Sequence, residues 1–210
     1  FFNNRGTPLF SINSYATLMY GYTFDEKDSA IYVPRDGNII KLSYRQNRFA
    51  EKLIPLISPG KEKLVTALLI NEKGELLAGT NDDRLYRLSP GSFKILNTYQ
   101  QTLSSFTALY QFNDQLLVGN YYGNITILHP ENLKAQYQLN EDATPSLNGV
   151  YLFKNRYMIT THFGVRGSSV KIWDIPAASL LQSFLLNANL AYDIKFSKNG
   201  DTIYSLHTDE

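Results

Sequence analysis

Three histidines and one pair of adjacent aspartates are the first candidates for chemistry in this 210-residue chain. His129, His162 and His207 are too far apart in sequence to form an H-x-x-x-H or H-E-x-x-H metal motif. Asp82 and Asp83 are neighbours, and successive side chains of an extended chain point to opposite sides, which disfavours a shared metal or an acid–base pair. The chain has no cysteine, so it has no thiolate nucleophile and no Cys-ligated metal.

One glycine-rich segment, "GVRGSS" at Gly164 to Ser169, combines glycines with hydroxyl groups. It lacks the lysine of a P-loop and follows an expected strand without opening a helix, so it does not predict a phosphate site. No G-x-S-x-G motif of a serine hydrolase is present. We therefore expect no catalytic residues, no metal, no cofactor and no enzyme activity in this chain.

The charge of the chain is balanced, with 20 Lys and Arg against 19 Asp and Glu. This balance argues against nucleic acid as a partner. The apolar runs are much shorter than the roughly 20 residues of a membrane-spanning helix, so no membrane insertion is expected. The sequence leaves the compartment unknown, with the cytoplasm favoured. Because the chain begins with Phe1 and stops at Glu210 within an expected strand, we expect it to be a piece of a longer protein.

A repeat sets the positions of the expected strands. The stretches "AIYVPRDGNIIKL", "LLAGTNDDRLYRL", "LLVGNYYGNITIL" and "YMITTHFGVRGSSVKIW" end at Leu42, Leu88, Leu128 and Trp173, which are 46, 40 and 45 residues apart. A second marker, "TAL", recurs after 41 residues. Each period holds four short runs rich in Val, Ile, Leu, Tyr and Phe, separated by Gly, Asn and Asp, which is typical of strands and hairpins.

Four antiparallel strands in about 40 to 45 residues form the blade of a β-propeller. We therefore predict an all-β fold, with about four complete blades and partial ones arranged as an open arc. We expect one propeller domain, residues 1–210, incomplete at both ends. Its blades are expected at residues 15–57, 63–100, 105–140 and 147–187, with a partial blade at 189–210. Unpaired edges near Phe10 and Ile203 should favour association of the chain.

The segments "VKIWDI" and "DIKFSKNGDTIYS" resemble the WD-repeat family, whose third strand often ends in the pair seen at Trp173 and Asp174. The resemblance covers four units between Tyr15 and Asn187. Elsewhere the pair is replaced by Leu42-Ser43, Leu88-Ser89 and Leu128-His129, and the Gly-His dipeptide of the family is missing. In that family an Asp in the turn between the second and third strands holds the blade together. The resemblance assigns this structural role to Asp36 and Asp82.

The resemblance implies a non-catalytic scaffold that binds a protein or a peptide. The stretch "LLAGTNDDRLYRL" is also similar to repeats of quinone-dependent dehydrogenases and of sensor-kinase propellers. A cofactor-binding or enzymatic propeller and an extracytoplasmic sensor module therefore remain alternatives.

The binding surface is expected on the face formed by the turns between second and third strands together with those from each fourth strand to the next unit, because alternate turns of an antiparallel meander emerge at the same end. The fourth unit has four more residues at this turn than the third, and we expect this hairpin, His162 to Ser169, to project outward. Turns of this kind also vary in length without consequence, which is the alternative interpretation. The residues expected on this rim are Arg35, Asp83, Arg84, Tyr121, Tyr122, His162, Phe163 and Arg166.

Most other aromatic residues alternate along the expected strands and are predicted to lie in the core. The clearest of these are Phe112, Phe153, Trp173 and Phe196. Tyr121 and Tyr122 differ, because they lie in a turn, where aromatic side chains often make contacts with a partner.

Overall fold

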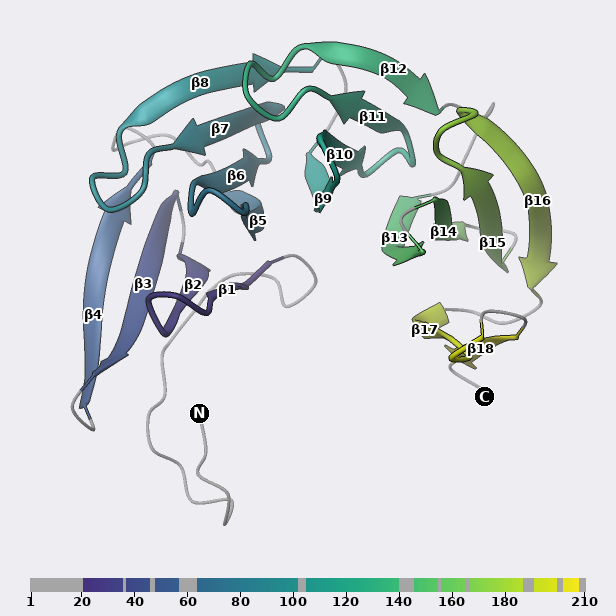
Figure 1. The fold of residues 1–210 in the computed structure, drawn as a ribbon, viewed down its shortest axis with the longest axis horizontal. Helices are drawn as coiled ribbons and strands as arrows, with labels where there is room; N and C mark the ends of the chain where they lie inside the picture. The colour runs from purple at the N-terminus through teal and green to yellow at the C-terminus, as the bar shows by residue number, and fades with distance from the viewer. Residues whose placement is uncertain are drawn as a thin grey trace. The chain divides into compact units, whose positions relative to one another are not determined.

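A computed structural model describes residues 21–35, 37–45, 48–56, 64–101, 105–139, 146–154, 156–164, 167–186, 191–199 and 202–207. These residues form β-strands joined by turns, and they contain no helix (Figure 1). The described part of the chain accordingly has no helix with the length and apolarity needed to span a membrane. The expected all-β fold is confirmed for these residues.

The chain divides into two compact units, Phe1–Thr98 and Tyr99–Glu210. The first unit contains two four-stranded sheets. Only the last two residues of strand β8 belong to the second unit. The strands of the first sheet are β1 (Thr23–Asp25), β2 (Ala30–Arg35), β3 (Asn38–Arg45) and β4 (Arg48–Pro55). Those of the second sheet are β5 (Val65–Ile70), β6 (Leu76–Thr80), β7 (Arg84–Leu88) and β8 (Ile95–Gln100).

The second unit contains two more four-stranded sheets and a two-stranded one. The third sheet comprises β9 (Phe106–Phe112), β10 (Gln115–Asn120), β11 (Ile125–Leu128) and β12 (Ala135–Leu139). The fourth comprises β13 (Ser146–Phe153), β14 (Tyr157–Gly164), β15 (Gly167–Asp174) and β16 (Ser179–Leu186). The remaining strands are β17 (Ala191–Phe196) and β18 (Ile203–His207).

Each sheet is an open meander in which strands that follow one another in sequence lie side by side. Neighbouring strands within the described sheets pair antiparallel, for example with Leu117 opposite Ile127 in β10 and β11. The predicted four-stranded blades of a β-propeller are therefore confirmed. The open arc that we expected concerns both units together and stays a prediction.

Within each unit, neighbouring sheets pack face to face on apolar side chains. In the first unit, Tyr32 and Ile39 of the first sheet share a cluster with Leu76 and Leu88 of the second. In the second unit a larger cluster joins the third and fourth sheets, and a smaller one joins the fourth sheet to Ile194 of β17. Strands β6 and β11 are buried along their whole length. The repeat thus forms a core only when blades stack.

The turns between first and second strands contain residues with a positive φ. Gly74 has a φ of 76°, and at the matching turns of the third and fourth sheets Asn113 and Lys154 have φ values of 49° and 47°. Asn71 closes the first of these turns, because its Oδ1 accepts hydrogen bonds from the backbone N–H groups of Lys73 and Glu75.

The predicted core aromatics are only partly confirmed. Phe112 and Trp173 are buried, with 6% and 4% of their surface exposed. Phe153 is half-buried rather than part of the core, because it lies at the end of β13 where the sheet meets the turn. The Phe196 side chain lies outside the described residues.

Candidate binding surface

The turn between β10 and β11 presents two tyrosines to solvent on a hydrogen-bonded backbone. Asn120 N donates to Asn124 O, Gly123 N donates to Asn120 O, and Asn120 Oδ1 accepts from Asn124 N, all at 3.0 Å. Gly123 supplies the positive φ of 82° that closes the turn. Tyr121 and Tyr122 are 52% and 56% exposed, and their rings meet edge to face with centroids 6.0 Å apart. The two rings are therefore displayed by a turn whose backbone is held in place.

The matching hairpin of the fourth sheet, β14 and β15, has longer strands than β10 and β11 of the third sheet. β14 and β15 pair in regular register as far as Gly164 opposite Gly167. The four extra residues of this unit therefore lengthen both strands of the hairpin, in which Phe163 and Ser168 continue the ladder of hydrogen-bonded residues. Residues 165 and 166 at its tip lie outside the described residues, and the outward projection of the hairpin stays a prediction. Phe163 lies at the end of β14 with 42% of its surface exposed.

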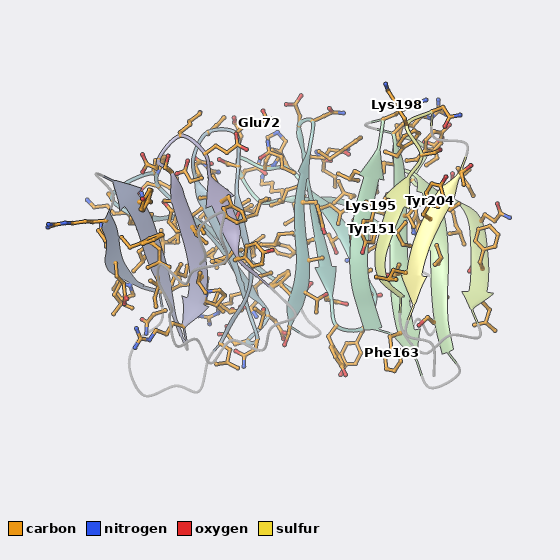
Figure 2. The ribbon with its side chains drawn as sticks, turned by 90° about the horizontal axis from the view of Figure 1, so that it is seen from below. Glu72, Tyr151, Phe163, Lys195, Lys198 and Tyr204 are labelled. Atoms are coloured by element: carbon orange, nitrogen blue, oxygen red, sulfur yellow. The ribbon has the colours of Figure 1, made fainter. Side chains whose placement is uncertain are left out.

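The two turns lie at the same end of the second unit. A Cβ added to Gly119, at the end of β10, would lie 2.2 Å from Leu147 Cδ2, so β10 and β13 approach closely there. Leu147 is in turn opposite His162, the neighbour of Phe163. Figure 2 shows Phe163 at one end of the second unit and Lys198, in the turn between β17 and β18, at the opposite end. We call Tyr121, Tyr122 and Phe163 the aromatic face.

The charged side chains of the described turns in this unit belong to the opposite end. Asp174 is the last residue of β15, and Arg156 immediately precedes β14. Arg156 Nη2 lies 2.8 Å from Asp174 Oδ2, and this hydrogen bond lowers the pKa of Asp174 below its ordinary value. By contrast, Tyr121 to Asn124 and Phe163 carry no charge. Within the described residues, the turn side chains near the aromatic face carry no charge, whereas those at the opposite end include Asp174 and Arg156. Arg166, which is expected on the same rim as Phe163, lies outside the described residues.

His162 does not belong to the exposed rim, which corrects the sequence-based expectation. Only 1% of its surface is exposed, so its side chain is buried at the end of β14. Its Nε2 lies 2.8 Å from Thr160 Oγ1, and the same hydroxyl accepts a hydrogen bond of 2.9 Å from Trp173 Nε1. His162 is thus part of a buried polar group that joins β14 to β15.

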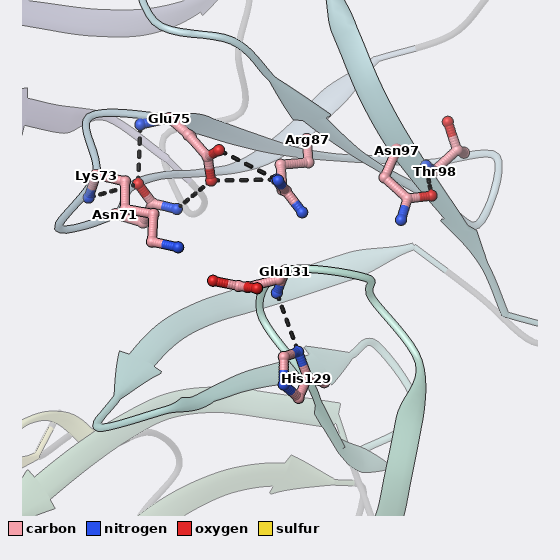
Figure 3. Close-up of polar contacts among 8 residues, drawn as sticks. All are labelled: Asn71, Lys73, Glu75, Arg87, Asn97, Thr98, His129 and Glu131. Atoms are coloured by element: carbon pink, nitrogen blue, oxygen red, sulfur yellow. Dashed lines mark hydrogen bonds and ion pairs between the residues drawn. The ribbon is translucent and has the colours of Figure 1, made fainter.

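His129 also has a structural place rather than a catalytic one. Its Nδ1 accepts a hydrogen bond of 3.3 Å from the backbone N–H of Glu131, as Figure 3 shows. Ser89 Oγ and Asp174 Oδ1 accept backbone N–H groups of the corresponding turns, at 3.0 and 3.3 Å. Ser89 and His129 stand where the Trp-Asp pair has its Asp. Each therefore caps, in its own sheet, the turn that corresponds to the one capped by Asp174. His207 lies at the end of β18, and its side chain is outside the described residues.

In the first unit, both expected rim arginines contact acidic groups of their own sheet. Arg35 Nη1 lies 3.2 Å from Glu51 Oε1. Arg84 Nε lies 3.7 Å from Asp82 Oδ2, and a hydrogen bond with the Tyr86 side chain raises the pKa of Arg84.

Asp82 interacts within its own turn. Thr80 Oγ1, which is buried, lies 2.5 Å from Asp82 Oδ1 and 2.9 Å from the backbone O of Arg84. Asp83, next to it, has a φ of 66° and is half-buried. The geometry of Asp82 is that of a residue that holds a turn. The other two predicted residues, Asp36 and Arg166, lie outside the described residues.

A buried polar cluster that the sequence did not reveal lies in the second sheet (Figure 3). Glu75, 8% exposed, accepts a hydrogen bond of 2.8 Å from Asn71 Nδ2, and its Oε2 lies 3.1 Å from Arg87 Nε. The only signal in the sequence is the pair of charges on facing strands. Because these groups bind one another, the cluster holds the turn in place. In the part of the chain that the structure describes, no three His, Asp or Glu side chains are grouped as metal ligands.

Comparison with known proteins supports the fold. No protein-family model and no curated protein matches the chain. In contrast, 1085 chains of solved structures do, so the architecture is widespread and does not by itself indicate a function. One match is to the "Crystal Structure of Mitotic Checkpoint Complex", with a TM-score of 0.71 and 12% identity over 89% of this chain. The chain spans 56% of that neighbour's length. At this identity the likeness establishes the β-propeller fold alone, which supports the resemblance to WD-repeat proteins only at the level of the fold.

Proposed function

We propose that this chain is a non-catalytic, WD-repeat-like scaffold that binds a protein or peptide through the aromatic face of its second unit. We further propose that residues 1–210 belong to one propeller domain. The solved neighbour is a component of a protein complex by its title, which agrees with a role in protein interaction.

The exposure of Tyr121, Tyr122 and Phe163 is the observation that carries the proposal. These side chains are 52%, 56% and 42% exposed, at an end of the unit where the described turn residues carry no charge. Large aromatic side chains lose little conformational entropy on binding and dominate the energetics of many interfaces. Tyr121 and Tyr122 are carried by a hydrogen-bonded turn and Phe163 by the paired end of β14, so the surface is preorganised for a partner.

The test compares the proteins captured by the full-length protein and by its Tyr122→Ala, Phe163→Ala double variant, quantified by mass spectrometry. A typical hot-spot side chain contributes about 2 kcal/mol or more, so the recovery of a direct partner should fall by well over tenfold. Tyr204→Ala is the matched control, because Tyr204 is 62% exposed on β18, away from the aromatic face.

Equal recovery with the double variant, at an unchanged melting temperature, would remove the aromatic face from the binding site. A loss with Tyr204→Ala as large as that with the double variant would argue against this location too.

A further inference from the structure

The outermost strand of the fourth sheet has an unprotected edge. Among the described strands, β16 pairs with β15 alone, so the backbone groups of its other edge are available to another strand. Three of its apolar side chains are also exposed, Leu181 at 54%, Phe184 at 40% and Leu185 at 69%. A long apolar edge of this kind is a template for strand pairing.

The outer strands of the other sheets have features that disfavour such pairing. β4 carries Arg48, Glu51 and Lys52 and ends at Pro55. β12 is only five residues long, and three of the six residues of β8 are polar, compared with three of the eight residues of β16. Charges, proline and short length are the usual means by which proteins protect a sheet edge. β16, with eight residues, has no charge and no proline, and its pairing with β15 is regular except for a register shift at Leu181.

The sequence of β16 matches itself when it is read in the opposite direction. "LLQSFLL", residues 180–186, is nearly palindromic about Ser183. In an antiparallel pair of two such strands with Ser183 on the two-fold axis, Leu181 lies opposite Leu185 of the other copy. Gln182 then lies opposite Phe184, and no like charges meet because the strand has no charged residue. A two-fold interface requires this kind of self-complementary patch.

We propose that β16 pairs with the β16 of a second copy of this chain, in antiparallel register centred on Ser183. The two fourth sheets then form one continuous sheet of eight strands across the two-fold axis. This inference rests on β16 and not on the aromatic face. A variant that is monomeric still carries Tyr121, Tyr122 and Phe163.

Sedimentation velocity of the full chain over a range of concentrations tests the pairing. We expect a monomer–dimer equilibrium and a dissociation constant at least tenfold higher for Leu185→Lys, which places a lysine ammonium in the apolar pair. The matched control is Leu206→Lys on β18. Leu206 has a similar exposed fraction, 63%, and lies on the strand that begins at Ile203, the other sheet edge expected to favour association. Leu206→Lys should leave the dimer unchanged. A wild-type chain that stays monomeric, or a dimer abolished by Leu206→Lys and kept by Leu185→Lys, would overturn the proposal.

An engineered thiol tests the register independently of any loss of folding. The chain has no cysteine, so Ser183→Cys introduces a single thiol at the proposed axis. Residues directly opposite in an antiparallel pair have Cα atoms about 4.5–5.5 Å apart, within the range that a disulfide bridges. We expect Ser183→Cys to form a covalent dimer on mild oxidation and Ala135→Cys, at an exposed position of β12, to remain largely uncrosslinked. Equal crosslinking of the two variants would show that the copies do not pair through β16.

Discussion

The close approach of β10 and β13 predicts that Gly119→Ala destabilises the second unit. Gly119 does not have a positive φ, so alanine suits its backbone, and the smaller entropy of the unfolded chain would favour alanine. The obstacle is packing. The new Cβ would lie 2.2 Å from Leu147 Cδ2 and 3.3 Å from Ala108 Cβ, whereas ordinary contacts are 3.4–4 Å.

The size of the effect follows from the burial of Leu147. This side chain is 1% exposed and packs in the cluster that joins the third and fourth sheets, so it cannot swing into solvent. Overpacking of a core by one methyl group costs about 1–3 kcal/mol, and we expect Gly119→Ala to fall in this range. Leu147→Ala alone should cost about 2–5 kcal/mol, because it leaves a cavity.

Urea denaturation of the wild type, both single variants and the double variant forms a double-mutant cycle. Since Leu147→Ala removes the atom that collides with the new Cβ, Gly119→Ala should cost almost nothing in that background. The coupling free energy should then be about 1–3 kcal/mol, close to the cost of Gly119→Ala itself. Gly91→Ala, whose new Cβ would meet nothing within 4 Å, should instead be additive with Leu147→Ala. An additive Gly119–Leu147 cycle, or a Gly119→Ala variant as stable as the wild type, would refute the reasoning.

Three further predictions concern buried polar groups of the second unit. Thr160→Val leaves the indole N–H of Trp173 without its acceptor and should lower the free energy of unfolding by about 1–3 kcal/mol in urea, whereas Thr160→Ser should retain most of the stability. Burial raises the pKa of Tyr110 above its ordinary value of 10.0, so its stabilising contribution is complete below pH 10 and is lost as the pH rises through the folded-state pKa. Tyr110→Phe should therefore reduce the fall of the melting temperature above pH 10, and an unchanged alkaline profile would contradict this. Arg156 lowers the pKa of Asp174 below 3.8, so the ion pair stabilises the fold above that pH and the contribution is lost on acidification. The difference in melting temperature between the wild type and Arg156→Gln should accordingly be largest near neutrality and should disappear as the pH falls below 3.8. A difference in melting temperature that persists in acid would count against the ion pair.

The strand content of the blades could be predicted because it depends on local chemistry. Alternating Val, Ile, Leu and Tyr favour strands, and Asn, Gly and Asp favour the turns between them, so the repeat located four strands in each period. The exposure of Tyr121 and Tyr122 was predictable for the same reason, since the Tyr-Tyr-Gly-Asn segment forms a turn too short to bury two rings. The prediction that Asp82 has a structural role agrees with the hydrogen bond from Thr80.

The sequence alone thus determined the period, the strand type and the places where the chain turns, because neighbouring residues decide these properties. Only the tertiary structure decided which face of each strand is covered, because that depends on the next blade. His162 became a buried partner of Thr160 rather than a rim residue for this reason. Ladder pairing between β14 and β15 placed the four extra residues of the fourth unit in longer strands. The close approach of β10 and β13 at Gly119 and Leu147 is likewise a tertiary contact. These outcomes depend on packing between residues distant in sequence, which the pattern of a single blade does not contain.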